Sequence, residues 1–335
     1  MLRTALRSMA WAAGAAALAL HIVVMTCFAG RWDKTAAVTV FPIWTWAIAG
    51  LALALLAWAV VRARFLGLVS LLWLLTLLIC PDEWRGLRRS LWQNTAPPAR
   101  ERPAATPLLR VATLNCKGGN IQAVREAAAW QPDVLLLQEM RAWSQPWLRE
   151  LAKEMWGGEG SAVFGYDTAI LARGKLTPRV LTAPGLFQQF VQATLEQPDG
   201  RSMEVLSVHL QGHVTDMRLW RWQVWRAHAQ NQRRHRLYVA DTIARQLLIG
   251  EGRPCLIGGD FNSPAGDRTF QTLEKHFDDA FATAGSGWGN TFRNDWPLLR
   301  IDQIWATSEL RPTGARAIET KHSDHRLVVA DYAWK

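Results

Sequence analysis

A short stretch around Asp260 and Asn262 has the residue types of a catalytic loop. An apolar run at 254–257 leads into two glycines, after which the acid and the amide stand one residue apart. This pattern predicts a buried strand that opens abruptly into a loop, where the glycines would let the backbone approach a ligand. Asp260 could orient or deprotonate a water molecule, and Asn262 could hold water or phosphate in place. For this stretch alone, an Asx-turn that closes a strand is the alternative.

Other polar side chains stand at the ends of further predicted strands. They are Asn115, Glu139, His209, Asp302, Asp324 and His325. Each one alone has an ordinary explanation, such as a turn residue, a satisfied core histidine or a cap. Because strand ends in a sandwich converge on one rim, we expect the whole set to meet there.

The chemistry of this set is that of phosphoryl transfer. Hard oxygen ligands that suit Mg²⁺ or Mn²⁺ come from Asn115, Glu139 and Asp324. The sequence contains no cluster of soft ligands. His209 and His325 could donate hydrogen bonds to a phosphoryl group as its charge develops. Asp302 is a candidate partner that sets the tautomer of His325.

The part of the chain that carries these residues predicts an α+β sandwich. Strands are expected at 109–115, 133–138, 168–172, 190–195, 203–209, 254–259, 301–306 and 326–332. Helices are expected at 120–130 and over much of 216–248. Many strands joined by short links favour this class over a doubly wound parallel sheet. Cys116 and Cys255 lie on predicted strands, where free thiols are usually buried, and a bridge between them stays open.

Six motifs, in order, resemble the endonuclease/exonuclease/phosphatase superfamily, which includes DNase I-like nucleases, inositol-polyphosphate phosphatases and neutral sphingomyelinases. They are Thr113-Leu114-Asn115, Gln138-Glu139, Ser207-Val208-His209-Leu210, Gly259-Asp260-Phe261-Asn262, Ile301-Asp302-Gln303-Ile304 and Ser323-Asp324-His325. The resemblance covers residues 108–335 and implies a four-layer α/β sandwich with Mg²⁺-dependent phosphoester hydrolysis. It also implies these roles: a metal site from Asn115, Glu139 and Asp324, Asp260 as base, and Asn262, His209 and His325 around the phosphate.

One position departs from the pattern of some nucleases in that superfamily. They carry an acid two residues after the first motif's asparagine, and this chain has Lys117. A lysine cannot ligate a metal, but it could meet a substrate phosphate. The departure gives less weight to a nuclease with a fully carboxylate-lined site.

The N-terminal part, residues 1–82, predicts a membrane anchor. Three uncharged apolar stretches at about 9–29, 38–61 and 65–80 are expected to be transmembrane helices, since a span needs about 20 apolar residues. Residues 83–107 are expected to be a linker before the catalytic domain at 108–335. Flanking arginines and lysines number four on one side and five on the other, so they do not orient the spans. We place the catalytic domain outside the cytoplasm of a bacterial inner membrane, as membrane-anchored relatives are arranged.

The stretch 216–236 interleaves tryptophan with arginine. On a helical wheel Met217, Trp220 and Val224 share one face, which is expected to be core. The opposite side holds the candidate substrate- or membrane-binding residues Arg218, Trp222 and Trp225. Such a face suits anionic lipid headgroups, although it could also stack on single-stranded nucleic acid or be an ordinary solvated helix.

These observations together predict a membrane-anchored, divalent-metal-dependent phosphoesterase. The formal net charge of +10 indicates an anionic partner. We expect a phosphate ester or pyrophosphate, with a lipid-linked substrate preferred because the anchor would hold it at high effective concentration. The alternatives are a metal-dependent nuclease acting on DNA or RNA and a non-catalytic membrane adaptor.

Overall fold

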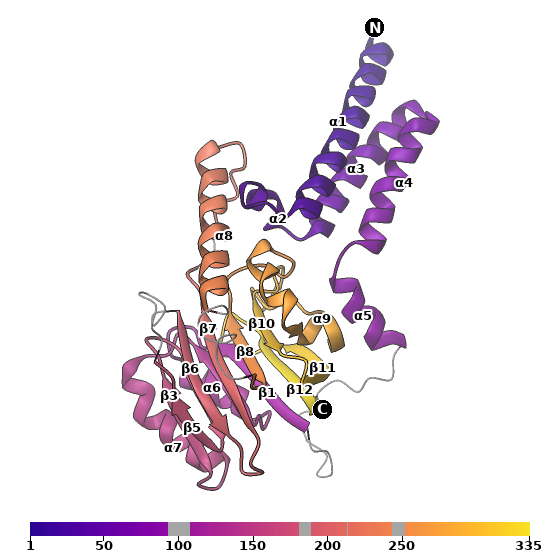
Figure 1. Ribbon diagram of the computed structural model, residues 1–335. Coiled ribbons are helices and arrows are strands. Elements are labelled where there is room, and N and C mark those ends of the chain that lie inside the picture. Colours follow the sequence, from indigo (N-terminus) through magenta and orange to yellow (C-terminus); the bar gives the residue numbers. More distant parts are fainter. Residues whose placement is uncertain (93–107, 181–188, 213, 243–251) are drawn as a thin grey trace. The chain divides into compact units, whose positions relative to one another are not determined.

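The computed structural model describes residues 1–92, 108–180, 189–212, 214–242 and 252–335 (Figure 1). The chain divides into two compact units. The first contains Met1–Trp84 and Val214–Gln232, and the second contains Arg85–His213 and Arg233–Lys335.

The first unit is built from apolar helices. They are α1 (Leu2–Gly30), α2 (Ala36–Thr39), α3 (Ile43–Val61) and α4 (Arg64–Ile79), with a 3-10 turn at Asp33–Thr35. Two of them, α1 and α3, are long and apolar enough to cross a membrane, and the number rises to three if α4 and the helix after it form one broken span. Two of the three expected spans therefore meet the length of a transmembrane helix, whereas α4 with 16 residues falls short by itself.

Small residues and satisfied polar groups hold these helices together. A Cβ on Gly50 would lie 2.1 Å from the ring of Trp73, so only glycine lets α3 and α4 approach this closely. The Trp73 indole donates to the carbonyl of Ala17 at 3.1 Å. The Nε2 atom of His21 lies 2.8 Å from the hydroxyl of Thr76, which satisfies the ionisable side chain of α1.

The second unit contains two six-stranded sheets. The first has the order β11-β12-β1-β2-β4-β3 and the second has the order β5-β6-β7-β8-β10-β9. The strands of the first sheet are β1 (Leu108–Asn115), β2 (Val134–Gln138), β3 (Gly160–Phe164), β4 (Ala169–Arg173), β11 (Leu310–Ile318) and β12 (Leu327–Trp334). Those of the second are β5 (Lys175–Pro178), β6 (Phe190–Glu196), β7 (Ser202–His209), β8 (Cys255–Asp260), β9 (Asp278–Asp279) and β10 (Asp302–Ala306). Each sheet mixes one parallel pair with antiparallel pairs.

The two sheets pack face to face, and helices cover their outer faces (Figure 1). Alternate residues of β1 divide between two cores: Leu109 and Val111 face the second sheet, whereas Ala112 and Leu114 face the helices. The helices on that outer face are α6 (Ile121–Ala128) and α7 (Gln145–Met155). The outer face of the second sheet is covered by the C-terminal part of α8 (Trp222–Thr242) and by the 3-10 turns Arg268–Gln271 and Leu273–Lys275. The predicted α+β four-layer sandwich is confirmed.

The two strand cysteines do not pair. Both thiols are free and buried. Cys116 packs in the outer core of the first sheet and Cys255 in the outer core of the second, so both sheets separate them. The bridge that the sequence leaves open is excluded by this placement.

The stretch expected to be a linker begins with a helix, α5 (Glu83–Trp92). Gly86 packs against the loop after the short helix α9 (Ala280–Ala284), where the amide of Gly287 donates to its carbonyl at 3.1 Å. Residues 85–92 therefore belong to the catalytic unit. Residues 93–107 lie outside the described part of the chain, so a linker there stays a prediction.

Candidate active site

Strand register brings the acids and histidines of the second sheet together. His209 pairs with Asp260 across the parallel strands β7 and β8, and Asp302 pairs with Asp260 across the antiparallel strands β8 and β10. These three residues therefore occupy neighbouring positions at one edge of the sheet. Asn115, at the end of β1, faces them from the other sheet through a hydrogen bond to Asp260.

The glycines before Asp260 serve strand packing. Gly259 has a φ of 144°, and a Cβ there would lie 2.0 Å from the carbonyl oxygen of Val208. A Cβ on Gly258 would lie 2.6 Å from the side chain of Leu136 on the opposite sheet. The expectation that these glycines admit a ligand is wrong, because a neighbouring strand and the facing sheet already occupy the space.

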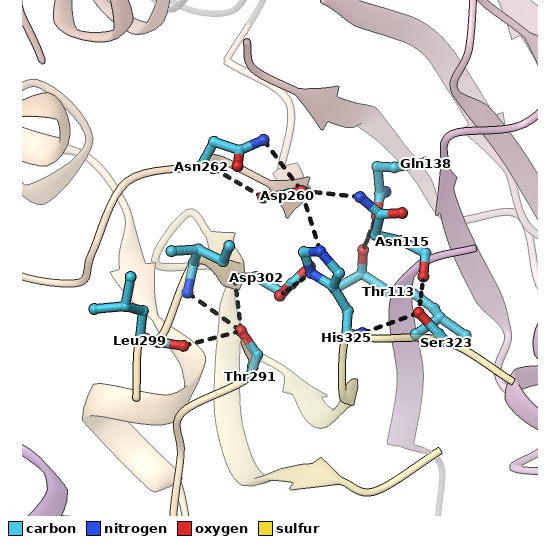
Figure 2. A network of polar contacts seen from close by, with 12 residues as sticks. Thr113, Asn115, Gln138, Asp260, Asn262, Thr291, Leu299, Asp302, Ser323 and His325 are labelled. Atoms are coloured by element: carbon cyan, nitrogen blue, oxygen red, sulfur yellow. Dashed lines mark hydrogen bonds and ion pairs between the residues drawn. The ribbon is translucent and has the colours of Figure 1, made fainter. Parts of the chain in front are cut away.

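The buried carboxylate of Asp260 is the centre of the polar network (Figure 2). Its Oδ1 accepts a hydrogen bond from the backbone amide of Asn262 at 2.8 Å. Its Oδ2 accepts from the side-chain amides of Asn115 at 3.0 Å and Asn262 at 3.2 Å. Burial raises the pKa of Asp260, and repulsion from Asp302 raises it further, while His325 and His209 oppose the shift.

Two Asp–His pairs flank this carboxylate. The Nδ1 atom of His325 lies 2.9 Å from Oδ2 of Asp302, and the Nδ1 atom of His209 lies 2.7 Å from Oδ2 of Asp167. The Nε2 atoms of both histidines lie 4.0 Å from the same oxygen, Oδ2 of Asp260. Each carboxylate therefore fixes one ring nitrogen, and the other nitrogen of each ring points into the space beside Asp260.

The neighbouring carboxylates raise the pKa of both histidines. Burial lowers the pKa of His325, but attraction to Asp302 and Asp260 outweighs it and raises the pKa to about 10. For His209 burial also lowers the pKa, and the hydrogen bond to Asp167 with the nearby charge of Asp260 raises it above the ordinary value. With a pKa of about 10, His325 carries both ring protons at neutral pH, so its Nε2–H group is a donor suited to a phosphoryl oxygen.

Asp167 is a site residue that the sequence reasoning missed. It lies in the turn between β3 and β4, where Gly165 donates to the carbonyl of Thr168 at 2.8 Å. Its own carbonyl accepts from the amide of Met140 at 2.8 Å, which ties the turn to the loop after β2. The only signal available in the sequence is an acid between two short strands, which is also the signature of a plain turn.

Asn115 and Glu139 lie together at the edge of the site. The amide of Asn115 donates to Oε1 of Glu139 at 3.1 Å, and the backbone amide of Gly118 donates to Oε2 at 2.7 Å. The hydroxyl of Ser323 donates to the carbonyl of Asn115 at 2.6 Å and so brings the segment of Asp324 to the same place. Asn115 and Glu139 thus bring together oxygen ligands of the kind that Mg²⁺ or Mn²⁺ prefers, whereas for Asp324 the Ser323 contact places only its segment of the backbone near them.

A second group of possible metal ligands exists among the described residues. Asp260, Asp302 and His325 are all buried, and their ligand atoms lie within 4.8 Å of one another. Within this group, Nδ1 of His325 lies 2.9 Å from Oδ2 of Asp302, so only its Nε2 atom is left for another partner. Mg²⁺ prefers oxygen ligands, which the Asn115 and Glu139 side chains also offer.

Three site residues hold left-handed backbone conformations. The φ angles are 45° for Lys117, 56° for Glu139 and 47° for Asn262. Such conformations cost free energy for non-glycine residues and persist only where the surroundings impose them. Lys117 is exposed, and its backbone amide donates to Oδ1 of Asn115 at 3.0 Å, which places it at the mouth of the site.

A buried polar bridge joins the sheets behind the site. The side-chain amide of Gln138 on β2 donates to Thr113 on β1 and to Ser207 on β7, both at 3.2 Å. Gln138, which the sequence marks only as the neighbour of Glu139, thus links the two sheets.

Exposed aromatic side chains stand on loops next to the site. Trp143 follows Glu139 in the loop after β2, and Tyr166 precedes Asp167. Trp296 lies on a loop whose Asn294 amide donates to the carbonyl of Asp324 at 2.7 Å. The exposed fractions are 64% for Trp143, 69% for Tyr166 and 74% for Trp296.

Most of the Trp/Arg stretch, residues 214–232, belongs to the first unit. Helix α8 begins at Trp222, so Met217 and Trp220 precede it; both are strongly exposed, and their expected place in a core is wrong. Arg218 is exposed and pairs with Asp216 at 2.5 Å. Trp222 is exposed, while Trp225 packs against the cluster of apolar helices.

A profile of the Endonuclease/Exonuclease/phosphatase family matches residues 112–325. The chain therefore belongs to this family, and it is a hydrolase acting on phosphoester bonds. The prediction that this protein is an enzyme is confirmed, and the alternative of a non-catalytic membrane adaptor is set aside. No sequence among the curated proteins matches the chain.

Solved structures share the fold at low identity. An endonuclease/exonuclease/phosphatase from Bacteroides vulgatus is 17% identical with a TM-score of 0.53, and the match covers 69% of this chain and 100% of that one. The human Nocturnin catalytic domain with bound sulfate anion is 20% identical with a TM-score of 0.51, covering 72% and 100%. D. rerio TDP2 complexed with single strand DNA product is 16% identical with a TM-score of 0.50, covering 68% and 100%.

Proposed function

We propose that this protein is a membrane-anchored, divalent-metal-dependent phosphoesterase that hydrolyses a phosphate ester or pyrophosphate of a lipid-linked substrate. The observation that carries the proposal is the convergence of two Asp–His pairs on the Asp260 carboxylate. The lipid assignment is supported by apolar helices long enough to span a membrane in the same chain.

Asp260 acts as the base in this proposal. Its buried carboxylate has a raised pKa, so it can take a proton from a water molecule more readily than an exposed aspartate could. The amides of Asn115 and Asn262 hold its orientation. Asn262 also places the attacking water or a phosphate oxygen.

His209 and His325 stabilise the phosphoryl group as its charge develops. Their Nε2–H groups converge from opposite Asp–His pairs, and the 4.0 Å separation from Asp260 leaves room for a bridging oxygen. Asp302 and Asp167 are positioning residues for these imidazoles. They act through the histidines rather than on the substrate.

Asn115, Glu139 and Asp324 would hold the Mg²⁺ (or Mn²⁺) ion. When bound, the ion would polarise the phosphoryl oxygens and neutralise part of their charge. Lys117, exposed at the mouth of the site, would meet a substrate phosphate.

Exposed aromatic and basic side chains support an interfacial substrate. Trp143, Tyr166 and Trp296 present rings with polar tips on loops bordering the site, a composition suited to a membrane–water interface. The predicted binding residues Arg218, Trp222 and Trp225 belong to the unit of apolar helices, which supports a membrane role for them. We further propose that the protein is integral to a bacterial inner membrane with its catalytic domain outside the cytoplasm. A topology reporter fused after Lys335 tests the side.

The experiment that tests the function uses the full-length protein in neutral detergent with Mg²⁺. Phosphate release from a polyprenyl pyrophosphate is measured beside nicking of supercoiled plasmid, with Asp260→Ala as the blank. We expect lipid turnover in the native protein and none in the variant. Lack of lipid turnover in a folded, metal-binding protein would refute the substrate class.

A nuclease is the second candidate. It is favoured by the shared fold with a TDP2 that was solved with a single strand DNA product. Plasmid nicking alone, falling steeply with salt because phosphate contacts release counterions, would establish it in place of the lipid substrate.

A further inference from the structure

One face of helix α5 is entirely basic and aromatic. Arg85, Arg88, Arg89 and Trp92 stand at positions i, i+3, i+4 and i+7, which share one side of a helix. Among the described residues, the same four side chains line an open pocket of about 390 Å³. A cavity lined by three guanidinium groups and one indole is suited to an anion.

Two residues fix α5 on the catalytic unit and orient this face. A Cβ on Gly86 would lie 2.4 Å from the carbonyl oxygen of Gly287, so the helix packs closely at this point. Arg89 donates to the carbonyls of Phe281 at 3.0 Å and Gly285 at 2.8 Å, and it also bonds Ala282. These carbonyls lie at the C-terminal end of α9, where a cation is favoured. Arg89 is thus fixed by the α9 carbonyls, whereas the side chains of Arg85 and Arg88 are exposed to solvent.

Positive charge exceeds negative charge around the cavity. Burial lowers the pKa of Arg89, and the neighbouring Arg85, Arg300 and Arg88 lower it further, with only Asp279 opposing. The Asp279 carboxylate already has partners, because it forms an ion pair with Arg300 at 2.6 Å and accepts hydrogen bonds from two backbone amides at the start of α9. Among the described residues, the guanidinium group of Arg88 has no hydrogen-bond or ion-pair partner. A bound phosphate would relieve this crowding of cations.

Chain connectivity limits the distance of this face from the end of α4. α5 begins four positions after Ile79, the last residue of α4. At roughly 3.5 Å per residue, Arg85 lies at most about 20 Å from the end of α4, a distance that reaches the headgroups of a membrane into which α4 inserts. Leu91 and Trp92 are strongly exposed on the same short helix, as expected of an interfacial segment.

We propose that the face formed by Arg85, Arg88, Arg89 and Trp92 binds the phosphate group of an anionic phospholipid. This rests on the membrane anchorage of the proposed function but not on its catalytic site. Arg85 and Arg88 bind the phosphate oxygens, Trp92 covers the glycerol part of the headgroup, and Arg89 holds the helix in place. The site would secure the catalytic unit at the membrane surface through a lipid that is not the substrate.

The test is a calorimetric titration of full-length protein in neutral detergent. Three probes are used: dihexanoyl-phosphatidylglycerol, dihexanoyl-phosphatidylcholine and inorganic phosphate. We expect phosphatidylglycerol to bind at least tenfold more tightly than either of the others. Arg85→Gln/Arg88→Gln should weaken its binding at least tenfold, and Arg88→Gln alone, at an exposed position, should weaken it about fivefold without affecting the fold.

A matched control separates this site from general charge near a membrane. Arg62→Gln/Arg64→Gln removes two exposed arginines from the turn between α3 and α4 and should leave binding within twofold. Asp260→Ala should also bind normally, so failure of the catalytic proposal would not affect this one. Equal loss in the Arg62/Arg64 variant, unchanged binding in the Arg85/Arg88 variant, or equally tight binding of inorganic phosphate would each overturn the proposal.

Discussion

Asp167 and His209 belong to different sheets, and Oδ2 of the aspartate nevertheless lies 2.7 Å from Nδ1 of the histidine. Asp167 comes from the turn between β3 and β4, while His209 ends β7. The pair therefore joins the two sheets at the mouth of the site. The Asp302–His325 pair does the same, because Asp302 opens β10 of the second sheet and His325 stands just before β12 of the first sheet.

Replacement of Asp167 by Asn should shift the pH dependence of the enzyme. The Asp167 hydrogen bond is the main cause that raises the pKa of His209, so its loss lowers that pKa. His209 would then lose its proton at lower pH, and the basic limb of the kcat/KM profile should move to lower pH. Activity at neutral pH should fall about 10- to 100-fold.

The same variant should change stability with a defined sign. The raised pKa of folded His209 contributes stability that is fully present below the unfolded value of about 6.5 and is lost as pH rises through the folded value. The stability loss in Asp167→Asn should therefore be larger at pH 6 than at pH 9 in thermal melts. Asp199→Asn, at an exposed carboxylate paired with Arg201, is the control. An unshifted basic limb would contradict the role of Asp167.

Metal removal should abolish hydrolysis, and the ligand variants should raise the metal requirement. Chelation with EDTA stops activity, and Mg²⁺ or Mn²⁺ restores it. Glu139→Gln and Asp324→Asn should each raise the Mg²⁺ concentration for half-maximal rate about tenfold or more, because each removes a charged oxygen. Glu126→Gln, which changes a surface acid that contacts His322 and the amide of Lys321, should not. If Asp302→Asn alone weakens Mg²⁺ binding, the ion belongs with Asp260 and His325.

Gly259→Ala should destabilise the catalytic unit strongly. The new methyl group would lie 2.0 Å from the Val208 carbonyl oxygen in a backbone conformation with φ of 144°. We expect a loss of about 3 kcal/mol or more, since a backbone atom cannot move aside without breaking the strand pair. Gly200→Ala is the matched control, because its φ is also positive at 85° but its surroundings are open. It should cost only about 1 kcal/mol in the same thermal unfolding measurement.

Asp331→Ala should destabilise the first sheet without altering the chemistry. Arg110 on β1 donates to both oxygens of Asp331 on β12, at 2.7 and 2.9 Å, and both side chains are largely buried. Removing the acid leaves a buried guanidinium charge that lacks its bidentate partner, which costs about 3–5 kcal/mol. Thermal unfolding should show this, while kcat of the folded fraction stays near the native value. The double change Arg110→Met/Asp331→Leu should recover much of the loss.

Strand-end positions of the site were predictable because strand pairing is a local and periodic property. Apolar runs ending in Asn115, His209 and Asp260 predict both a strand and the edge at which it stops. Asp167 was not predictable in this way, since its partner His209 is 42 positions away and nothing local marks the turn as catalytic.

Other elements were missed for equally local reasons. β11 contains Pro312 and Gly314, which read as a loop, and the strand accommodates them with a register shift between these residues. The helical wheel over 216–225 assigned the wrong faces because the residues before Trp222 are not helical and α8 begins only there. α5 was read as linker because its apolar face is short, and it is held mainly by Gly86 and Arg89.

The direct pairing of His209 and Asp302 with Asp260 has a consequence for how the enzyme fails on heating. These residues are fixed by the hydrogen-bond ladder of three adjoining strands rather than by loops. Their backbone amides should therefore exchange with deuterium as slowly as the most protected part of the sheet. The loss of activity on heating and the unfolding of that sheet should therefore have the same temperature dependence, because local fraying of strand ends does not displace the catalytic carboxylate.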